Sequence, residues 1–260
     1  MNTGLVLSGG GAKGIAHIGA IKALEEHNIY PTYIAGTSSG AIVGALYASG
    51  CNWEEILDFF KKVQIFNFNS YARNKPGFID TEKFYDVFRD YFPSDNFNTL
   101  KKKLFITTTN ILSGTLEIFN SGELIKPLLA SAAYPGVFTP VKIKENYYID
   151  GGTLNNFPVD LIKMFCNQVI GVYVNPFKKV KIEDLKYSYA VFERAFRIKI
   201  SSDSFTKFND CNLLIYPEEL NNFGTFSLNN VDVIFNLGYE STIKALKTEE
   251  GVKVLEIVHN

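Results

Sequence analysis

The sequence is poor in several residues and patterns that define whole classes of protein. It holds three cysteines and three histidines in 260 residues, too few and too scattered for a disulfide framework or a metal site. We therefore expect a reducing compartment and neither metal nor cofactor. No stretch of about 18 apolar residues occurs, so we expect no transmembrane helix. The first residues lack the basic segment and apolar run of a signal peptide, and we expect a cytoplasmic protein.

A strong charge imbalance is also absent. The formal net charge is −1, so the composition does not favour nucleic acid as a partner. No internal repeat or linker interrupts the chain, and we expect one domain over residues 1–260, with no indication of its oligomeric state. Hydrophobic residues make up 46% of the chain, as in globular proteins. The 22 Phe and 14 Tyr fit either an aromatic core or a surface for an apolar ligand.

Apolar runs alternate with helical patterns in the first 50 residues. The pattern predicts strands over 5–7 and 33–35, each followed by a helix, over 15–27 and 39–49. Such alternation indicates parallel strands with crossover helices, and hence an α/β fold. Small residues on one side of the second helix would let its backbone lie close to the sheet.

The remaining chain is less regular. We expect further strands over 104–110, 115–120, 147–149, 169–174 and 213–216, and helices over 53–62, 81–91, 124–133, 188–208 and 231–246. Thr81 is the expected N-cap of its helix. The aromatic loop 66–78 is either a lid over a ligand or a packing element, and residues 178–199 carry seven Lys or Arg against three Asp or Glu. That excess fits transient contact with an anionic membrane surface or an ordinary solvated helix face.

One short segment has the pattern of an exposed nucleophile. Gly36-Thr37-Ser38-Ser39-Gly40 lies between a predicted strand and a predicted helix, which is the setting of a nucleophile elbow. Gly36 and Gly40 would remove side chains that clash in so tight a turn. The spacing selects Ser38, whose hydroxyl would stand near the free N–H groups at the start of the helix. A chance match at a strand–helix junction is the alternative.

The segment Gly9-Gly10-Gly11-Ala12-Lys13-Gly14 follows the first predicted strand. A dinucleotide-binding loop would require an acidic residue near the end of the second strand, and residues 33–38 contain none. A loop of N–H groups that stabilises an acyl oxyanion is the preferred interpretation, because a nucleophile pattern follows on the next strand. Lys13 would either add positive charge to the site or point to solvent.

A serine nucleophile needs a base, and the histidines are poorly placed to provide one. His27 and His259 lie at the end of a predicted helix and of the chain. His17 could reach the site, but a histidine packed in its helix is the simpler interpretation. Asp150, after an apolar strand and before Gly151-Gly152, is the better candidate, since a partly buried carboxylate can act directly as the base. An ordinary Asp-Gly turn is the alternative.

Four blocks together resemble the patatin-like phospholipase family. They run in the order Gly9–Gly14, Gly36–Gly40, Ser131–Pro140 and Asp150–Gly152, and Asn155, Asn156 and Pro158 add to the likeness. The resemblance covers about residues 3–160 and is weak beyond Pro158. It implies a three-layer α/β/α fold with a mostly parallel central sheet.

The resemblance also implies a chemistry. Ser38 would be the nucleophile and Asp150 its base, in a dyad that replaces the triad, with the N–H groups of Gly10, Gly11 and Ala12 as oxyanion donors. The protein would then be a lipid acyl hydrolase that needs no calcium, acting on a phospholipid, lysophospholipid or neutral lipid ester. A lipid-binding protein without activity on the same fold is one alternative. A nucleotide-dependent oxidoreductase is the second.

Overall fold

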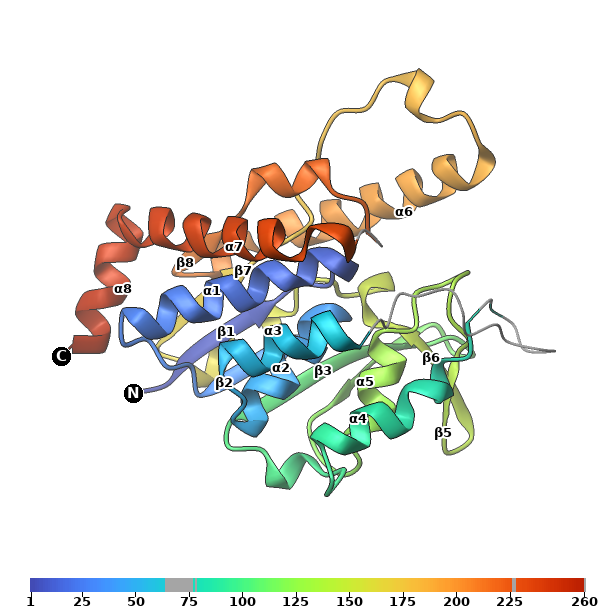
Figure 1. Ribbon diagram of the computed structural model, residues 1–260, viewed down its shortest axis with the longest axis horizontal. Coiled ribbons are helices and arrows are strands. Elements are labelled where there is room, and N and C mark those ends of the chain that lie inside the picture. The colour runs from blue at the N-terminus through green and yellow to red at the C-terminus, as the bar shows by residue number, and fades with distance from the viewer. Residues whose placement is uncertain (64–76, 78, 226–227, 260) are drawn as a thin grey trace.

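The computed structural model describes residues 1–63, 77, 79–225 and 228–259 (Figure 1). Five parallel strands form the centre of one sheet, in the order β3-β2-β1-β7-β8. The apolar runs became strands because both faces of these segments are covered, as in β1 and β7, where every residue is buried. Their bounds are Thr3–Leu7 (β1), Tyr33–Gly36 (β2), Lys103–Asn110 (β3), Gln168–Val172 (β7) and Leu213–Ile215 (β8).

Three antiparallel strands extend the sheet beside β3: β4 (Thr115–Phe119), β5 (Val141–Ile143) and β6 (Asn146–Asp150). Ile106 of β3 pairs with Gly36 of β2 and Phe119 of β4, whereas Thr108 pairs with Asp150 of β6 and Glu117 of β4. Since β4 pairs with one edge of β3 from Ile106 to Asn110, β2 and β6 must follow one another along the other edge. The end of β6 therefore arrives beside the end of β2.

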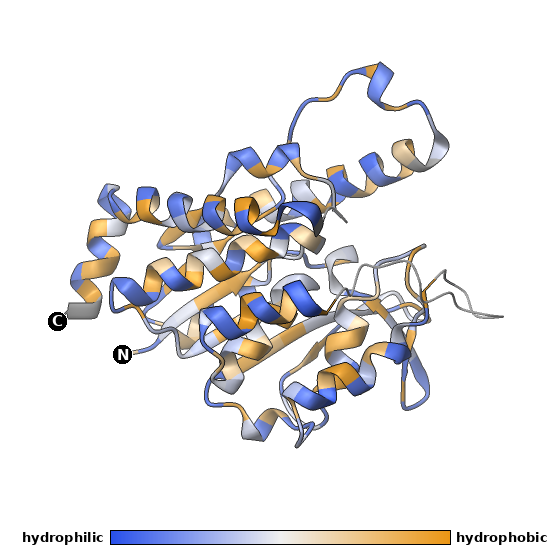
Figure 2. Ribbon diagram, viewed as in Figure 1, coloured by the Kyte–Doolittle hydropathy of each residue, from blue (hydrophilic) through white to orange (hydrophobic). Residues whose placement is uncertain are grey.

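The two faces of the sheet are covered by different parts of the chain. One face packs Leu5, Leu7 and Ile34 against the helices, and the other packs Val6 and Ala35 against the segment 157–162 and Tyr173. Apolar residues accordingly gather in the central strands and the helices beside them (Figure 2). The expected mostly parallel sheet with flanking helices is confirmed. The helices are α1 (Ile15–Glu26), α2 (Ser39–Ser49), α3 (Trp53–Lys62), α4 (Tyr85–Tyr91), α5 (Ile125–Ser131), α6 (Ser188–Phe205), α7 (Val231–Leu246) and α8 (Glu249–His259).

The backbone of α2 lies almost against the sheet, as its small residues predict. A Cβ on Gly40 would stand 2.3 Å from the carbonyl oxygen of Leu7 in β1, and one on Gly44 would stand 2.9 Å from Ile34 Cγ2. Glycine is required at position 40 because the obstacle is backbone, which cannot rotate away. This close approach fixes the start of α2 relative to β1.

Four details differ from the sequence expectations. The N-cap assignment of Thr81 was wrong: the Asp80 side chain caps this turn by accepting from the amide of Glu82 (3.3 Å). Thr81 is buried and its hydroxyl donates to the carbonyl of Thr139 (2.6 Å). The last helix, α8, and the three-residue strand β5 were not predicted, and α6 ends at Phe205 rather than 208.

The aromatic loop 66–78, which by its sequence is either a lid or a packing element, lies outside the described residues apart from residue 77. Among the helices that the structure describes, none combines the length and the apolar character needed to cross a bilayer.

Candidate active site

Ser38 occupies the turn between β2 and α2 in a backbone conformation that non-glycine residues rarely adopt. Its φ is 54° and its ψ is −125°, a strained combination with a cost of about 1–3 kcal/mol. The amide of Ser38 donates to the hydroxyl oxygen of Ser131 (2.8 Å), and Ser38 is the N-cap of α2. The surroundings therefore hold the strained turn in place, and the side chain is 8% exposed.

The glycines on either side of Ser38 make this turn feasible. A Cβ on Gly36 would lie 2.6 Å from the carbonyl oxygen of Gly40 and 2.7 Å from the Cα of Ala41. The chain thus folds back on itself across the turn, with Gly40 pressed against β1 as described above. The sequence pattern placed glycine where the three-dimensional turn has no room for a side chain.

Asp150 ends β6 and is 4% exposed. Its carboxylate accepts a hydrogen bond from the amide of Gly152 (2.7 Å), and its own amide donates to the carbonyl of Ala133 (3.0 Å). Burial raises the pKa of Asp150 to about 6, against the opposing effects of hydrogen bonds from the Gly152 amide and the Ser38 hydroxyl. The structure thus brings together the two side chains that the sequence selected.

Gly151 explains how the carboxylate comes so close to the nucleophile. A Cβ at this position would lie 2.3 Å from the carbonyl oxygen of Thr107 in β3. Only glycine therefore fits at the first position after β6. Gly152 follows and supplies the amide that orients the carboxylate. The pair after Asp150 is therefore more than an ordinary turn.

The glycine-rich loop offers fewer free N–H groups than the sequence indicated. The amide of Gly9 donates to Asn156 O (3.2 Å), that of Ala12 to Thr225 O (2.8 Å) and that of Lys13 to Gly10 O (3.3 Å). The expectation that Ala12 is an oxyanion donor is therefore corrected. Gly10 and Gly11 line the same cavity as Ser38 and Asp150, and their amides have no acceptor among the described residues. Gly14 packs under Ser39 instead.

Lys13 in this loop and His17 just after it are both buried. Lys13 does not point to solvent: it is fully buried, and its Nζ has no hydrogen-bond partner within the described part of the chain. Burial holds the pKa of Lys13 well below its usual value. His17 is buried with Nε2 2.8 Å from the carbonyl oxygen of Ser8, and burial lowers its pKa to about 4. The interpretation of His17 as a packed helical residue is confirmed.

A cavity of about 110 Å³ opens at Ser38 and Asp150. Its far side is formed by Tyr134, by the segment 175–180 and by α6, which contributes Arg194 and Arg197. The sequence singles out the block 131–140 and the basic excess over 178–199, but it places none of these residues at the site. The position of Asn175, a polar residue directly after a buried strand, was a usable signal, because ligands gather at the carboxyl ends of parallel strands. The basic excess of α6 could not assign single residues to the cavity, since a charged helix usually faces solvent.

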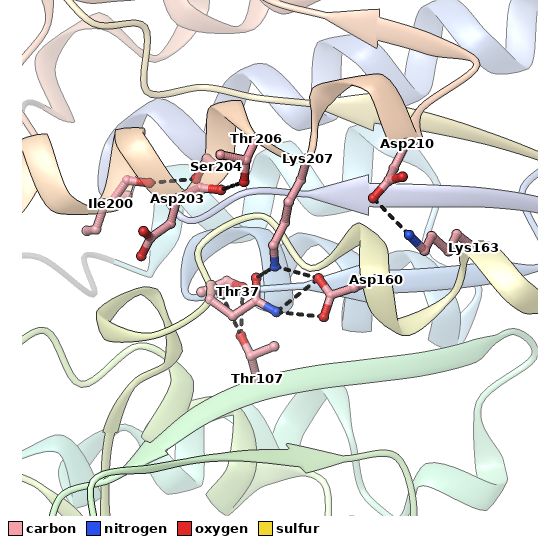
Figure 3. Close-up of polar contacts among 11 residues, drawn as sticks. Thr37, Thr107, Asp160, Lys163, Ile200, Asp203, Ser204, Thr206, Lys207 and Asp210 are labelled. Carbon is pink, nitrogen blue, oxygen red and sulfur yellow. Dashed lines mark hydrogen bonds and ion pairs between the residues drawn. The ribbon is translucent and has the colours of Figure 1, made fainter.

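A polar network runs from the buried Thr37, next to the nucleophile, to the exposed Asp160 (Figure 3). Thr37 contacts Thr107 Oγ1 (2.6 Å) and donates to the carbonyl of Asn155 (2.9 Å). The amide side chain of Asn155 in turn donates to Asp160 (3.2 Å), and Lys207 donates to Asn155 Oδ1 (2.8 Å) and Asp160 Oδ1 (2.6 Å). The network ties the turn at Ser38 and the loop after Asp150 to the chain beyond α6.

A serine on a strand–turn–helix elbow beside a buried carboxylate, under free backbone amides, is the arrangement found in hydrolases that form an acyl-enzyme. The chain matches the patatin-like phospholipase family over residues 5–162. It belongs to this family.

Curated relatives share this region. The chain is 34% identical over 166 residues to lysophospholipase NTE1 of Scheffersomyces stipitis, which covers 62% of this chain and 11% of that protein. It is 33% identical over 180 residues to lysophospholipase NTE1 of Debaryomyces hansenii, covering 66% and 12%. The chain thus spans about a ninth of the length of these relatives.

Solved structures extend the likeness to the whole chain at the level of the fold. VipD from Legionella pneumophila aligns with a TM-score of 0.55 and 16% identity, over 94% of this chain and 66% of that one. The type III effector protein ExoU aligns with a TM-score of 0.52 and 18% identity, over 96% and 53%. These similarities support the architecture, including the part beyond residue 162.

Proposed function

We propose that this protein is a lipid acyl hydrolase of the phospholipase A or lysophospholipase type, with Ser38 as nucleophile and Asp150 as its base. The observation that carries the proposal is the strained serine whose hydroxyl faces a buried carboxyl with a pKa of about 6, in one cavity. Family membership and the lysophospholipase relatives support the choice of lipid esters as substrates.

The first half of the cycle forms an acyl-enzyme. Asp150 accepts the proton of the Ser38 hydroxyl as its oxygen attacks the ester carbonyl carbon. The amides of Gly10 and Gly11 donate to the oxyanion, and loss of one such donor costs about 10²–10³ in rate. Protonated Asp150 then gives its proton to the departing alcohol oxygen as the ester bond breaks.

The second half releases the fatty acid. Asp150, again ionised, accepts a proton from the water that attacks the acyl carbon. The tetrahedral intermediate collapses, the Ser38 oxygen leaves and takes back that proton, and the free enzyme returns. No step requires a metal, and no group of three or more His, Cys, Asp or Glu is placed to hold one in the described residues. We expect a chelator of divalent cations to leave the rate unchanged.

An active-site probe separates this proposal from its alternatives. A fluorophosphonate should label the wild type at Ser38 and stop hydrolysis of lysophospholipid, phospholipid and monoacylglycerol esters alike. Ser38→Ala should lose labelling and at least about 10⁴-fold in kcat, whereas Ser39→Ala, which removes a buried hydroxyl without a partner in the described part of the chain, should keep both. A chain that binds lipid but ignores the probe would be the non-catalytic protein. A chain that binds NAD instead would be the oxidoreductase.

We also propose that the projecting segment before and within α6 contacts the lipid surface from which the substrate comes. This segment stands away from the body of the protein (Figure 1). Ile182 and Phe192 are 76% and 64% exposed, and Lys178, Lys179 and Lys181 directly precede Ile182 in the sequence. Exposed apolar side chains among lysines suit the interface of an anionic bilayer. The same segment forms part of the cavity.

Vesicle sedimentation tests this contact. Vesicles with phosphatidylglycerol should bind the wild type several-fold better than vesicles of phosphatidylcholine alone, and the difference should shrink with salt. Ile182→Ser with Phe192→Ser should reduce binding to both. Equal sedimentation of wild type and this variant with both vesicles would contradict the proposal.

A further inference from the structure

The cavity at the proposed nucleophile is lined by cations that the acyl-transfer steps do not use. Lys178, Arg194 and Arg197 line it, and Asp150 is the one acidic residue among the described lining residues. Arg194 and Arg197 are one turn apart on α6, so both side chains project from the same face of the helix. The wall that faces Ser38 is therefore electropositive even when Asp150 is ionised.

Arg194 is held in place by contacts that leave part of its guanidinium available. Its Nη2 donates to the carbonyl of Lys178 (2.8 Å), and its guanidinium stacks over the ring of Phe177 at 4.1 Å. An arginine has five N–H donors, and this carbonyl uses one of them. The guanidinium is thus oriented at the cavity by neutral partners, and no carboxylate pairs with it in the described part of the chain.

Arg197 has neither a hydrogen-bond acceptor nor an ion-pair partner among the described residues. It lies near enough to Lys13 and Arg194 to lower the pKa of both by repulsion. Glu193 also faces Lys13, but it does not line the cavity and accepts from the hydroxyl of Thr225 (3.4 Å). Two guanidiniums that repel one another, without a carboxylate between them, form a site that an anion would stabilise.

We propose that Arg194 and Arg197 bind the phosphate of a glycerophospholipid head group while its acyl ester lies at Ser38. The inference rests on the proposed function and names its substrate class. A guanidinium binds phosphate oxygens through paired, charge-assisted hydrogen bonds. In glycerophospholipids the phosphate is a few bonds from the ester, which agrees with Ser38, Arg194 and Arg197 lining one cavity. Neutral acylglycerols lack this anchor.

Binding of ether lipids tests the site independently of hydrolysis, because an ether has no ester to cleave. Calorimetry should give a Kd at least about tenfold lower for 1-O-alkylglycerol-3-phosphate than for the neutral 1-O-alkylglycerol, both below their micellar concentrations. Arg197→Gln should abolish that ratio, and Arg194→Gln should reduce it. Arg89→Gln removes the same charge from an exposed position on α4 and should leave the ratio intact.

Three controls accompany the binding measurement. Inorganic phosphate should compete only at much higher concentration than the ether lipid; equal competition would mean a phosphate site without a lipid. Unchanged melting temperatures should show that the variants fold, and Arg197→Lys, which keeps the charge, should retain part of the ratio. A wild type that binds both ether lipids equally would overturn the inference, as would an unchanged ratio in both glutamine variants. If the wild type hydrolysed none of the esters, the proposed function would be contradicted. The preference for the phosphorylated ether lipid would still support the phosphate site.

Discussion

The two walls of the cavity are made in different ways. Gly10, Ser38 and Asp150 stand at or just beyond the ends of β1, β2 and β6, and backbone hydrogen bonds and close contacts fix them. The opposite wall consists of half-exposed side chains on α6 and the segment 175–180. Apart from Tyr134, the residues of that wall lie beyond residue 162, where the family match ends. Under the proposed function, the reaction chemistry would depend on backbone conformation and the choice of substrate on side chains that can vary without disturbing the sheet.

The largest expected effect tests the backbone-defined wall. Asp150→Asn should lower kcat by about 10³-fold, within the range of a lost general base, in single-turnover and steady-state assays. Asp90→Asn, an exposed change on α4, is the control and should have no effect. Near-wild-type activity of Asp150→Asn would mean that another group is the base. The backbone-defined wall would then not supply the chemistry.

The same variant should be more stable than the wild type at neutral pH. The pKa of Asp150 is raised in the fold from 3.8 to about 6. The protonated carboxyl therefore stabilises the fold fully below pH 3.8, and this stabilisation is lost as the pH rises through about 6. Above pH 6 the ionised carboxylate costs up to about 3 kcal/mol. Denaturation by urea should therefore show a gain for Asp150→Asn at pH 7 that shrinks at pH 4. A gain of equal size at both values would contradict the raised pKa.

Activity should follow the same ionisation in the opposite sense. Because the ionised carboxylate is the proposed base, kcat/KM should rise about tenfold per pH unit below 6 and level off above it. A pH–rate profile on a neutral ester substrate gives this measurement without titration of the substrate. A flat profile between pH 4.5 and 7 would exclude Asp150 as the base.

An alanine in place of Gly40 at the nucleophile turn should mainly lower the stability of the fold. Gly40→Ala places a Cβ 2.3 Å from a backbone oxygen of β1, and should lower the free energy of unfolding by about 3 kcal/mol. Gly114→Ala is the matched control: its φ is +70° but no atom lies within 4 Å, so about 1 kcal/mol is expected. Gly40 has no positive φ, so a loss no larger than that of Gly114→Ala would contradict the role of the close approach to β1.

The smallest effect concerns Lys207, which connects the loop after Asp150 to the chain just beyond α6. Lys207→Met leaves Asn155 and Asp160 without their cation, and should lower kcat a few-fold and stability by about 1 kcal/mol. Lys163→Met breaks a comparable ion pair with Asp210 at the surface and should change neither measurably. A Lys207 variant with unchanged kcat would show that the two walls are independent.

Local sequence signals revealed the parts of the site that local geometry controls. The glycines at 36 and 40 indicated a tight turn, and the acid after the apolar run at 147–149 indicated a strand end. The commitment of the Ala12 amide to Thr225 carried no such signal, because its partner is more than 200 residues away. The basic excess over 178–199 pointed to the region of Arg194 and Arg197, but the sequence cannot tell which face of a helix turns toward a cavity. Strand β5 was too short to form a periodic pattern.

Because β2 and β6 pair with the same edge of β3, the proposed dyad forms only when β6 pairs in the correct register. Asp150 stands opposite Thr108, two residues beyond the partner of Gly36. A slip of β6 by one residue would turn Asp150 to the other face of the sheet, away from Ser38, while most of the fold stayed intact. Hydrolytic activity during refolding should therefore appear only after β6 has found its register, later than the compaction of the hydrophobic core.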